Sequence, residues 1–457
     1  MRIAWFSPLP PHRSGIAAYS AELLPRLRHH EIDAFVDDGT GAAGAAAVTP
    51  IPGMRIRGAH DFPWRQAVQP YDVVVYQLGN DACHEYMWPY LVRYPGLVVL
   101  HDAQLHQSRA QGLIGRGRET DYRAEFGYCH PEAPPGIADL IISGLGGTLY
   151  YVWPMTRVAV EAARLMVVHN AVLGRDLDRS NPGQAIRHVR QGVADLITAA
   201  RATPAEVRRR HGLPDDAILF GSFGRVTAQK GLTPVLRALA IIAPSMPAVR
   251  LLIVGDTPAY FDVAAQAEEL GVADRVVITG YLDEDALPEY LAAVDVSLNL
   301  RWPTARETSA AWLRCLAAGK PTIITDLAHQ TDIPSLDPRT RRPIFAMPPA
   351  GGPSDPICLI VGLDDEVNML RLGMAWLGGD AALRTRLGQA ARRYWETHAT
   401  LACMAEDYEA ALALASREPP TIHARWPAHL TEDGTGLARH LAASVGVPLA
   451  WLHATHP

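Results

Sequence analysis

Short apolar runs alternate with amphipathic stretches along most of the chain. Most of the runs are continuously apolar rather than alternating, which is typical of parallel strands covered on both faces. Helical patterns lie between them, for example at Ile16–Leu27 and Met155–Arg164. In the first half, strands are predicted at Ile3–Phe6, Ile32–Val36, Val73–Gln77, Leu97–Leu100, Leu165–Val168 and Ile186–Val189. These elements predict a parallel sheet flanked by helices.

The same alternation restarts after a polar helical stretch at Pro204–His211. Helices are predicted at Leu232–Ile242, Ala259–Leu270 and Asp285–Ala293, and residues 364–415 are strongly helical. Strands are predicted at Ile218–Phe223, Arg250–Val254, Arg275–Thr279, Val294–Leu298, Thr322–Thr325 and Cys358–Val361. Two such series predict an α/β protein with two Rossmann-like domains whose parallel sheets face a cleft.

These patterns also suggest where the domains begin and end. The first domain is expected at residues 1–195, with a helical and loop insertion at about 105–152 that contains no clear strand. The second is expected at residues 196–390. Residues 391–457 then form a C-terminal helix, which we expect to pack back on the first domain, and a tail with a short helix near Leu437–Ser444.

Composition and charge narrow the class of protein. The chain has 457 residues and a formal net charge of −6, which gives no support to a nucleic-acid partner. Its five cysteines form no C-x-x-C pair, so we expect reduced thiols in a cytoplasmic protein. No apolar stretch approaches the roughly 18–20 residues of a membrane span. Peripheral contact with the inner face of a membrane stays open through Arg116, Arg118, Arg123 and the aromatic stretch Tyr86–Tyr94, which includes Trp88.

The segment from Asn299 to Asp326 reads as loop, helix, short loop and strand. Polar residues sit where the helix is expected to begin, and a helix N-terminus offers free N–H groups and a positive dipole end to an anion. In an α/β fold, ligands bind beyond the carboxyl ends of the strands. The polar residues are Thr304, Arg306, Glu307, Thr308 and Ser309.

Two further loops follow predicted strands and lead into helices. Gly224-Arg225 and Lys230-Gly231 place two cations where both can reach a diphosphate, although a solvated loop with incidental cations is the alternative. Ser14-Gly15 follows the first strand; Gly15 lets a ligand approach the backbone, whereas simple capping by Ser14 is the alternative. There is no G-x-G-x-x-G motif, so the nicotinamide dinucleotide fingerprint is missing.

Other strand ends carry candidate chemistry. His101-Asp102 lies at the end of an apolar strand, where either side chain can orient a hydroxyl or transfer a proton, or the histidine can be structural. The turns at Gly255 and at Gly280-Tyr281-Leu282 offer backbone groups to a base edge, although plain turns are the alternative. No histidine or cysteine pair has a metal-ligand spacing such as H-x-x-x-H or C-x-x-C, so we predict no metal site.

Taken together, these pieces resemble the family-four retaining glycosyltransferases, also called glycosyl transferases group 1, which have the GT-B fold. The order and spacing of the motifs match over about residues 1–415, and the resemblance is to a bacterial subgroup of the surface-polysaccharide type. The matching pieces are the Ser14-Gly15 loop, His101-Asp102, the loop Gly224-Arg225 to Lys230-Gly231, the turns at Gly255 and Gly280-Tyr281, and the segment RETSAAWLRCLAAGKP.

The resemblance implies a hexosyltransferase that moves a sugar, with retention at the anomeric carbon, from a UDP-, GDP- or dTDP-sugar. The second domain would hold this donor, and the first would hold a glycan, lipid-linked or small-molecule acceptor. Apart from the resemblance, we expect the insertion to set acceptor specificity, because variable loops on a rigid scaffold usually carry it. No metal or other cofactor would be required. The alternatives are a GT-B epimerase or phosphorylase, and a catalytically inactive protein that binds a sugar nucleotide.

The resemblance also implies residue roles. Arg225 and Lys230 would bind the donor diphosphate, Tyr281 would lie at the base, and His101 would lie beside the transferred sugar. The implied catalytic residues are His101, Asp102 and Glu307, and the implied donor-binding residues are Gly15, Gly224, Arg225, Lys230, Gly255, Tyr281, Leu282, Thr308, Ser309 and Arg314.

One departure from the family concerns two glutamates separated by seven residues, of which the first touches the sugar and the second the ribose. Counting forward from Glu307 puts the second at Cys315. Counting back from Gly319 puts it at Arg314 and the first at Arg306. On either count the second glutamate is absent, and neither a guanidinium nor a thiol replaces it as an acceptor for ribose hydroxyls. Ribose recognition is therefore expected to differ, with Arg314 contacting a phosphate or pairing with a carboxylate.

Overall fold

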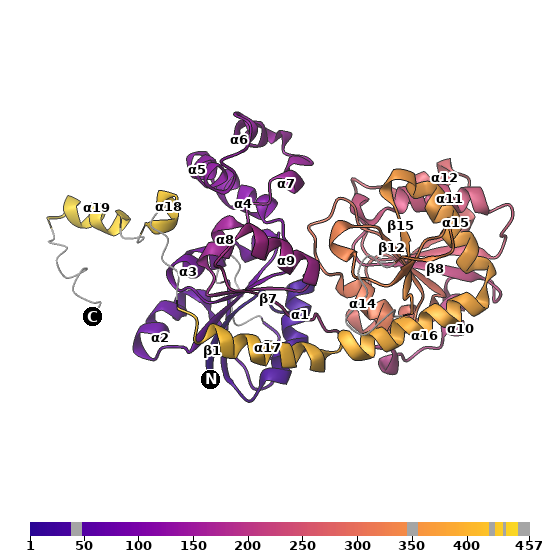
Figure 1. Cartoon of the computed structure of the whole chain (residues 1–457), viewed down its shortest axis with the longest axis horizontal. Helices are drawn as coiled ribbons and strands as arrows, with labels where there is room; N and C mark the ends of the chain where they lie inside the picture. The colour runs from indigo at the N-terminus through magenta and orange to yellow at the C-terminus, as the bar shows by residue number, and fades with distance from the viewer. Residues whose placement is uncertain (38–47, 345–354, 420–425, 433–435, 447–457) are drawn as a thin grey trace.

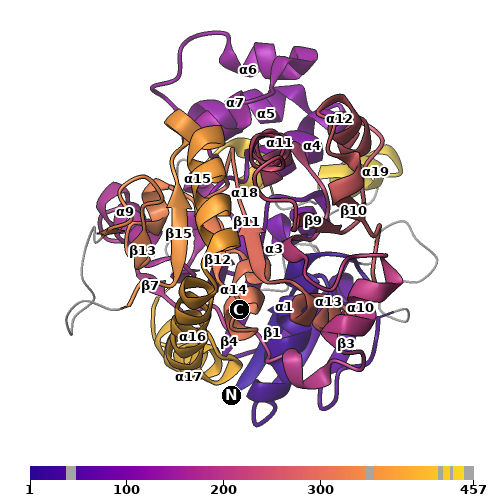
Figure 2. The ribbon, with the colours of Figure 1, turned by 90° about the vertical axis from the view of Figure 1, so that its right-hand side faces the viewer.

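A computed structural model describes residues 1–37, 48–344, 355–419, 426–432 and 436–446. Two α/β domains lie side by side, each built on its own sheet (Figure 1). A long rod formed by α16 (Ala381–His398) and α17 (Leu401–Ala415) runs along one side of both domains. In the perpendicular view of Figure 2 these two helices overlap, as expected for a rod seen along its length.

The N-terminal sheet has seven parallel strands in the order β3-β2-β1-β4-β5-β6-β7. Its central strands are apolar and buried, as the sequence predicts, whereas the edge strand β3 is polar and short and was not predicted. The strands are β1 Arg2–Phe6, β2 Glu31–Val36, β3 Arg55–Gly58, β4 Val73–Leu78, β5 Leu97–Leu100, β6 Leu165–Val168 and β7 Ile186–His188. The helices on its two faces are α1 Gly15–Leu23, α2 Phe62–Val68, α3 Trp88–Arg93, α8 Arg157–Ala162 and α9 Ala171–Ser180.

The segment between β5 and β6 is the expected insertion of helices and loops. It contains α4 His106–Leu113, α5 Glu119–Cys129, α6 Ile137–Leu140 and α7 Leu149–Val152, which project from the N-terminal domain (Figure 1). A buried Arg109 anchors it, because its guanidinium lies between Glu85 (2.7 Å) and Glu125 (2.6 Å).

The C-terminal sheet has the strand order β10-β9-β8-β11-β12-β15-β13-β14, in which β14 is antiparallel to β13 and the other pairs are parallel. Its strands are β8 Ile218–Phe223, β9 Val249–Val254, β10 Val276–Ile278, β11 Val296–Asn299, β12 Thr322–Thr325, β13 Ser335–Leu336, β14 Pro343–Ile344 and β15 Cys358–Val361. Its helices are α10 Pro204–Arg210, α11 Leu232–Ile242, α12 Val263–Glu269, α13 Leu287–Ala293, α14 Ala310–Ala317, α15 Glu366–Gly379 and α16.

The chain crosses between the domains twice, and the two crossings touch. The Val193 N–H donates to the Ala399 carbonyl (2.9 Å), and a side chain on Gly192 would lie 2.2 Å from the Thr400 carbonyl. The domain boundary expected at residue 390 falls inside α16, which stays on the C-terminal domain until His398. Beyond Thr400, α17 packs on α1, β5 and β6 of the N-terminal domain.

The C-terminal segment returns along the N-terminal domain. Helices α18 (Ala428–Thr431) and α19 (Gly436–Ser444) lie at the end of the molecule away from the C-terminal domain (Figure 1). The buried His429 donates to Glu125 (2.9 Å), the same carboxylate that holds Arg109. This contact ties the segment to the base of the insertion.

The expectation that the aromatic stretch Tyr86–Tyr94 forms part of a membrane-contacting surface is wrong. Trp88 is 4% exposed and lies under the guanidinium of Arg109, 4.1 Å from the ring centroid. Tyr90 packs against Phe6 in the same core. The stretch Tyr86–Tyr94 is therefore mainly interior, because α3 turns its aromatic face toward the sheet. Among the helices that the structure describes, none is long and apolar enough to cross a membrane.

Candidate active site between the two domains

A pocket of about 580 Å³ lies between the domains, where the carboxyl ends of the two sheets face each other. The N-terminal domain contributes the loop after β1 and the start of α1. The C-terminal domain contributes the loops after β8 and β10 together with α14. Five of the residues proposed for the donor line this pocket, namely Gly15, Gly224, Tyr281, Leu282 and Arg314.

The Ser14-Gly15 loop forms the N-terminal wall. Ser14 caps α1 by accepting a hydrogen bond from the Ala17 N–H (3.0 Å), so the capping interpretation is correct for Ser14. A side chain at Gly15 would meet no atom within 4 Å, and this space is open to a ligand. Across the pocket, the guanidinium of Arg13 lies 4.3 Å from the centroid of the Tyr281 ring and joins the two domains.

Three glycine turns pack together at the ends of β8, β9 and β10. Gly224 adopts a φ of +95°, and a side chain on Gly255 would lie 2.2 Å from the Gly224 carbonyl oxygen. Gly255 also forms a bridge with Gly280. Gly255 therefore packs against the backbone of the Gly224 loop and is not among the residues that line the pocket. The close backbone approach explains why glycine is needed there.

The two cations of the β8 loop lie at different depths. Arg225 is exposed, whereas the Lys230 amine is desolvated beneath the loop and donates to the Phe223 carbonyl. Burial, reinforced by the charge of Arg301, lowers the pKa of Lys230 to about 7. The sequence left open two cations that both reach a diphosphate or a solvated loop with incidental cations. The structure shows one exposed cation and one desolvated amine.

Asp102, Glu307 and Arg301 form a charged cluster next to Lys230. The Asp102 carboxylate accepts from the Asn80 N–H (2.7 Å), and Arg301 pairs with Glu307 (2.8 Å). Burial and the nearby negative charge of Glu307 raise the pKa of Asp102 to about 7. Two carboxyl groups from opposite domains therefore meet in the cleft, and near neutral pH one of them can gain or lose a proton.

His101 is anchored in the N-terminal domain through one of its two ring nitrogens. Its Nε2–H donates to the Gln77 side-chain oxygen (2.7 Å), which leaves Nδ1 as the hydrogen-bond acceptor. Gln77 in turn donates to the Tyr408 hydroxyl (3.3 Å), which also shares a hydrogen bond with the Tyr19 hydroxyl (2.6 Å). Burial lowers the pKa of His101 well below its usual value, so the ring is neutral at pH 7. The sequence did not indicate Gln77, Tyr19 or Tyr408.

The structure shows which candidate residues of the two family-spacing counts face the cleft, and it takes one residue from each count. The Glu307 carboxylate accepts from the Thr304 hydroxyl (2.9 Å) and lines the cleft, whereas Arg306, at a φ of +58°, pairs with Asp176 on α9. At the second position, Arg314 lines the interdomain pocket, whereas Cys315 is buried and shares a hydrogen bond with Ser297 (3.0 Å). The residues that face the cleft are therefore Glu307 and Arg314.

Arg314 reaches a carboxylate from the opposite domain. Its Nη2 donates to Glu22 Oε1 (2.6 Å), and Glu22 lies on α1 and lines the same pocket. Sequence reasoning had left open a carboxylate partner for Arg314 but did not identify it. Glu22 lies 292 residues away along the chain, so no local motif could reveal it.

Thr308 and Ser309 contact a second interdomain pocket of about 400 Å³, which Glu307 also lines. Ser309 caps α14 by accepting from the Trp312 N–H (3.2 Å), and the Thr308 hydroxyl donates to the His169 carbonyl (3.0 Å). Nearby, the Asn170 amide donates to the His329 carbonyl (2.6 Å). These contacts join the two domains next to Glu307.

Comparison with solved structures defines the class of protein. HepE from Anabaena in complex with UDP superposes with a TM-score of 0.61 at 12% identity, over 90% of this chain and 100% of that one. Sucrose-phosphate synthase from Thermosynechococcus elongatus superposes with a TM-score of 0.60 at 15% identity, over 90% and 98%. WaaG, a glycosyltransferase involved in lipopolysaccharide biosynthesis, gives a TM-score of 0.59 at 15% identity, over 91% and 100%. The fold is GT-B, as the sequence predicts.

Sequence comparison then gives the family. Residues 217–336 match the family model of glycosyl transferases group 1. A GDP-mannose-dependent alpha-(1-6)-phosphatidylinositol monomannoside mannosyltransferase of Mycobacterium tuberculosis is 30% identical over 302 residues, which are 63% of this chain and 69% of that protein. A 2-deoxystreptamine glucosyltransferase of Streptomyces kanamyceticus is 39% identical over 103 residues, but these are only 22% of this chain and 27% of that protein. The chain belongs to the glycosyl transferases group 1 family.

Proposed function

We propose that the protein is a retaining glycosyltransferase that moves a sugar from a nucleoside-diphosphate sugar to an acceptor, without a metal ion. The observation that carries the proposal is the interdomain pocket, in which the Gly15 loop of one domain faces Gly224, Tyr281 and Arg314 of the other. A nucleotide in this pocket would place its base near Tyr281 and its diphosphate near the β8 loop. The sugar would then lie toward Glu307 and Asp102.

Arg225 and Lys230 would hold the diphosphate. A charge-assisted contact to a phosphate strengthens as negative charge develops on the leaving group, which is how such a pair would favour the transition state. A diphosphate would also give the desolvated Lys230 amine, which lies beside Arg301, a further anionic partner. Two cations in this role make a divalent metal unnecessary for the reaction.

The ribose would be bound by Glu22. The carboxylate of Glu22 lies in the donor pocket and is fixed by Arg314 through a 2.6 Å hydrogen bond. A carboxylate accepts hydrogen bonds from hydroxyl groups, whereas a guanidinium only donates. The carboxylate that other members of the family place on the C-terminal domain would therefore come from α1 of the N-terminal domain.

The proposed chemical step exchanges one bond at the anomeric carbon. The acceptor oxygen forms a bond to this carbon on the face from which the nucleoside diphosphate departs, and the bond between the carbon and the phosphate oxygen breaks. The electron pair of that bond stays on the phosphate, which takes the acceptor proton. Asp102 and the neutral His101 would orient hydroxyl groups of the sugar and the acceptor.

The acceptor is proposed to be a glycan, lipid-linked or small molecule that enters beside the insertion. The insertion meets the other domain, since Tyr151 and Gln229 hydrogen-bond across the cleft. Its outer part exposes Leu140 (43%), Leu145 (65%) and Val152 (59%). Apolar side chains exposed beside a cleft favour a lipid-linked acceptor and peripheral contact with the inner face of the membrane.

The test is consumption of UDP-, GDP- and dTDP-sugars by the full chain in the presence of a chelator. We expect one donor to be hydrolysed or transferred at an undiminished rate after metal removal. The anomeric coupling constant of the first product, measured by proton NMR, should match that of the donor. Product of the opposite configuration would refute retention, and a rate that falls with the chelator and is restored by Mg²⁺ or Mn²⁺ would refute metal independence.

A further inference from the structure

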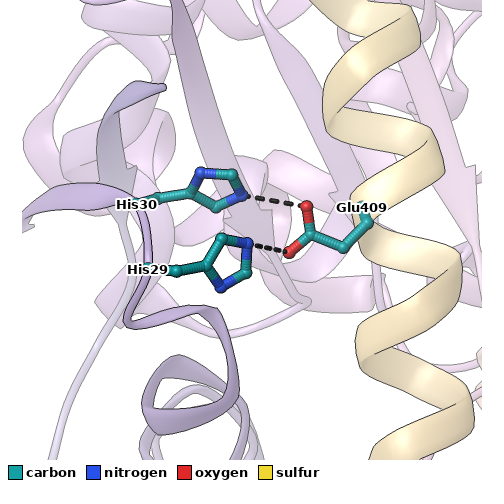
Figure 3. A group of neighbouring side chains, drawn as sticks. All are labelled: His29, His30 and Glu409. Carbon is teal, nitrogen blue, oxygen red and sulfur yellow. Dashed lines mark hydrogen bonds and ion pairs between the residues drawn. The ribbon is translucent and has the colours of Figure 1, made fainter.

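Outside the cleft, His29 and His30 follow η1 (Leu24–Leu27) and face helix α17. Figure 3 shows the rings of His29 and His30 pointing at the same carboxylate, that of Glu409. His29 Nε2 lies 3.0 Å from Oε1, and His30 Nε2 lies 2.9 Å from Oε2. The two rings are 4.1 Å apart between centroids. Each side chain offers one ligand atom, and these atoms all lie within 4.8 Å of one another.

We propose that His29, His30 and Glu409 form a site for one transition-metal ion, with Zn²⁺ as the best-matched ion. Two imidazoles and one carboxylate are a donor set that zinc prefers, and a water molecule would complete a four-coordinate shell. Zinc–ligand bonds of about 2.0–2.1 Å place tetrahedral ligand atoms roughly 3.3 Å apart. The nitrogen-to-oxygen distances in the cluster are close to this, so small side-chain rotations would admit the ion.

The exposure of the three side chains allows entry from solvent. The His30 side chain is 8% exposed and Glu409 is 38% exposed, whereas His29 is 59% exposed and forms the open side. Zinc would bind both Nε2 atoms, so the proton of each ring would move to Nδ1. At His30 the Met1 amine lies 3.3 Å from Nδ1 and would have to turn away, which the exposure of Met1 permits.

Such an ion would fix α17 to the N-terminal domain. Glu409 follows Tyr408, whose hydroxyl contacts Gln77 and Tyr19, so the metal would hold the helix next to the residues that position His101. The site lies apart from the donor pocket, since none of its three residues lines that pocket. The proposal therefore concerns a structural ion and does not depend on the proposed reaction.

The test is a calorimetric titration of ZnCl₂ into the chelator-treated full chain. We expect one strong site per chain, and both His29→Gln and Glu409→Gln should weaken its affinity at least about 10-fold. Saturating Zn²⁺ should raise the Tm of the wild type but not of these variants. Co²⁺ in place of Zn²⁺ should give the visible absorption of a tetrahedral ion.

The matched control is His440→Gln, which removes an exposed histidine of α19. This variant should keep the affinity and Tm response of the wild type. The proposal is overturned if the chain binds no Zn²⁺, if the strongest site survives both His29→Gln and Glu409→Gln, or if His440→Gln weakens it equally. Circular dichroism of the metal-free variants checks their folding. If one of His29→Gln and Glu409→Gln is misfolded, the zinc affinity of the other still tests the proposal.

Discussion

Asp102 and Lys230 are desolvated ionisable side chains in the cleft, and the pKa of each lies at about 7. The two pKa values are shifted in opposite directions, because burial raises the pKa of the carboxyl group and lowers that of the amine. The sequence suggested that both residues are functional because they follow strand ends. Their unusual pKa values could not be predicted, because they depend on neighbours such as Glu307 and Arg301 that only the tertiary structure brings near.

Replacing Asp102 by asparagine should stabilise the protein and impair its activity. The folded state holds the Asp102 proton up to about pH 7, whereas the unfolded state releases it near pH 3.9. The stability penalty of the carboxylate therefore grows as the pH rises through this window and is complete above pH 7. We expect Asp102→Asn to raise Tm more at pH 8 than at pH 5 while kcat falls. An equal Tm change at both pH values would contradict the assigned pKa.

The lowered pKa of Lys230 predicts that the protein takes up a proton when the donor diphosphate binds. At pH 8 the amine is mostly neutral in the ligand-free protein, because its pKa is about 7. A bound diphosphate stabilises the ammonium form, so the complex should take up a proton at pH 8 and little at pH 6. Calorimetry in two buffers of different ionisation enthalpy measures this uptake. It should vanish in Lys230→Arg, which stays charged, and equal heats in both buffers for the wild type would refute the contact.

At the scale of elements, the continuous apolar runs predicted the central strands of both sheets because parallel strands are buried on both faces. The edge strand β3 and the short strands β13 and β14 were missed, since they are polar or only two residues long. The start of α14 was predicted from its polar residues. The sequence could not show which side of α14 faces the cleft, and this decides between Arg314 and Cys315.

The contact between α1 and α14 predicts how ribose is recognised. If Glu22 binds the ribose hydroxyls, wild-type protein should bind a nucleoside diphosphate at least about 10-fold more tightly than its 2′-deoxy analogue, because a lost hydrogen bond to a charged group costs about 1.5–3 kcal/mol. Glu22→Gln should reduce this preference sharply. Arg314→Met, which keeps the carboxylate, should reduce it less. A purely structural ion pair would leave the ratio of the two dissociation constants unchanged in both variants.

The contact between α17 and the sheet predicts a distant effect on His101. Tyr408→Phe removes the hydroxyl that accepts from Gln77 (3.3 Å) and leaves a buried amide unsatisfied, at a cost of about 1–3 kcal/mol in the free energy of unfolding. Because Gln77 also orients His101, kcat should fall as well. The control is Ala411→Gly, which weakens the same helix by about 1 kcal/mol without touching Gln77. If kcat falls equally in both variants, Tyr408 acts through stability alone.

At the scale of the whole molecule, the two domains were predictable from the repeated strand and helix pattern, and the GT-B fold from the order of the motifs. The crossing points were less predictable. Helix α16 stays with the C-terminal domain up to His398, and the break at Ala399–Thr400 depends on contacts with Gly192 and Val193 that are distant in sequence. The residues that were not predicted, Glu22 in the cleft and the buried Gln77 next to His101, are likewise defined by contacts between distant segments.

The arrangement of the domains explains how the site is completed. Hydrogen bonds from Thr308 to His169 and from Asn170 to His329 join the two domains where Glu307 of one lies near Asp102 of the other. We propose that the β8 loop of the C-terminal domain binds the donor diphosphate against the N-terminal domain.

The most direct measurement of this claim is the rate of donor consumption by the wild type, Arg225→Met, Lys230→Met and the exposed control Arg209→Met, with folding checked by circular dichroism. We predict that each of the two loop variants loses about 100-fold or more in kcat/KM, as expected when a contact to a developing charge is removed, while Arg209→Met is unaffected. Near-normal rates in both loop variants, or no donor consumed by the wild type, would contradict the account.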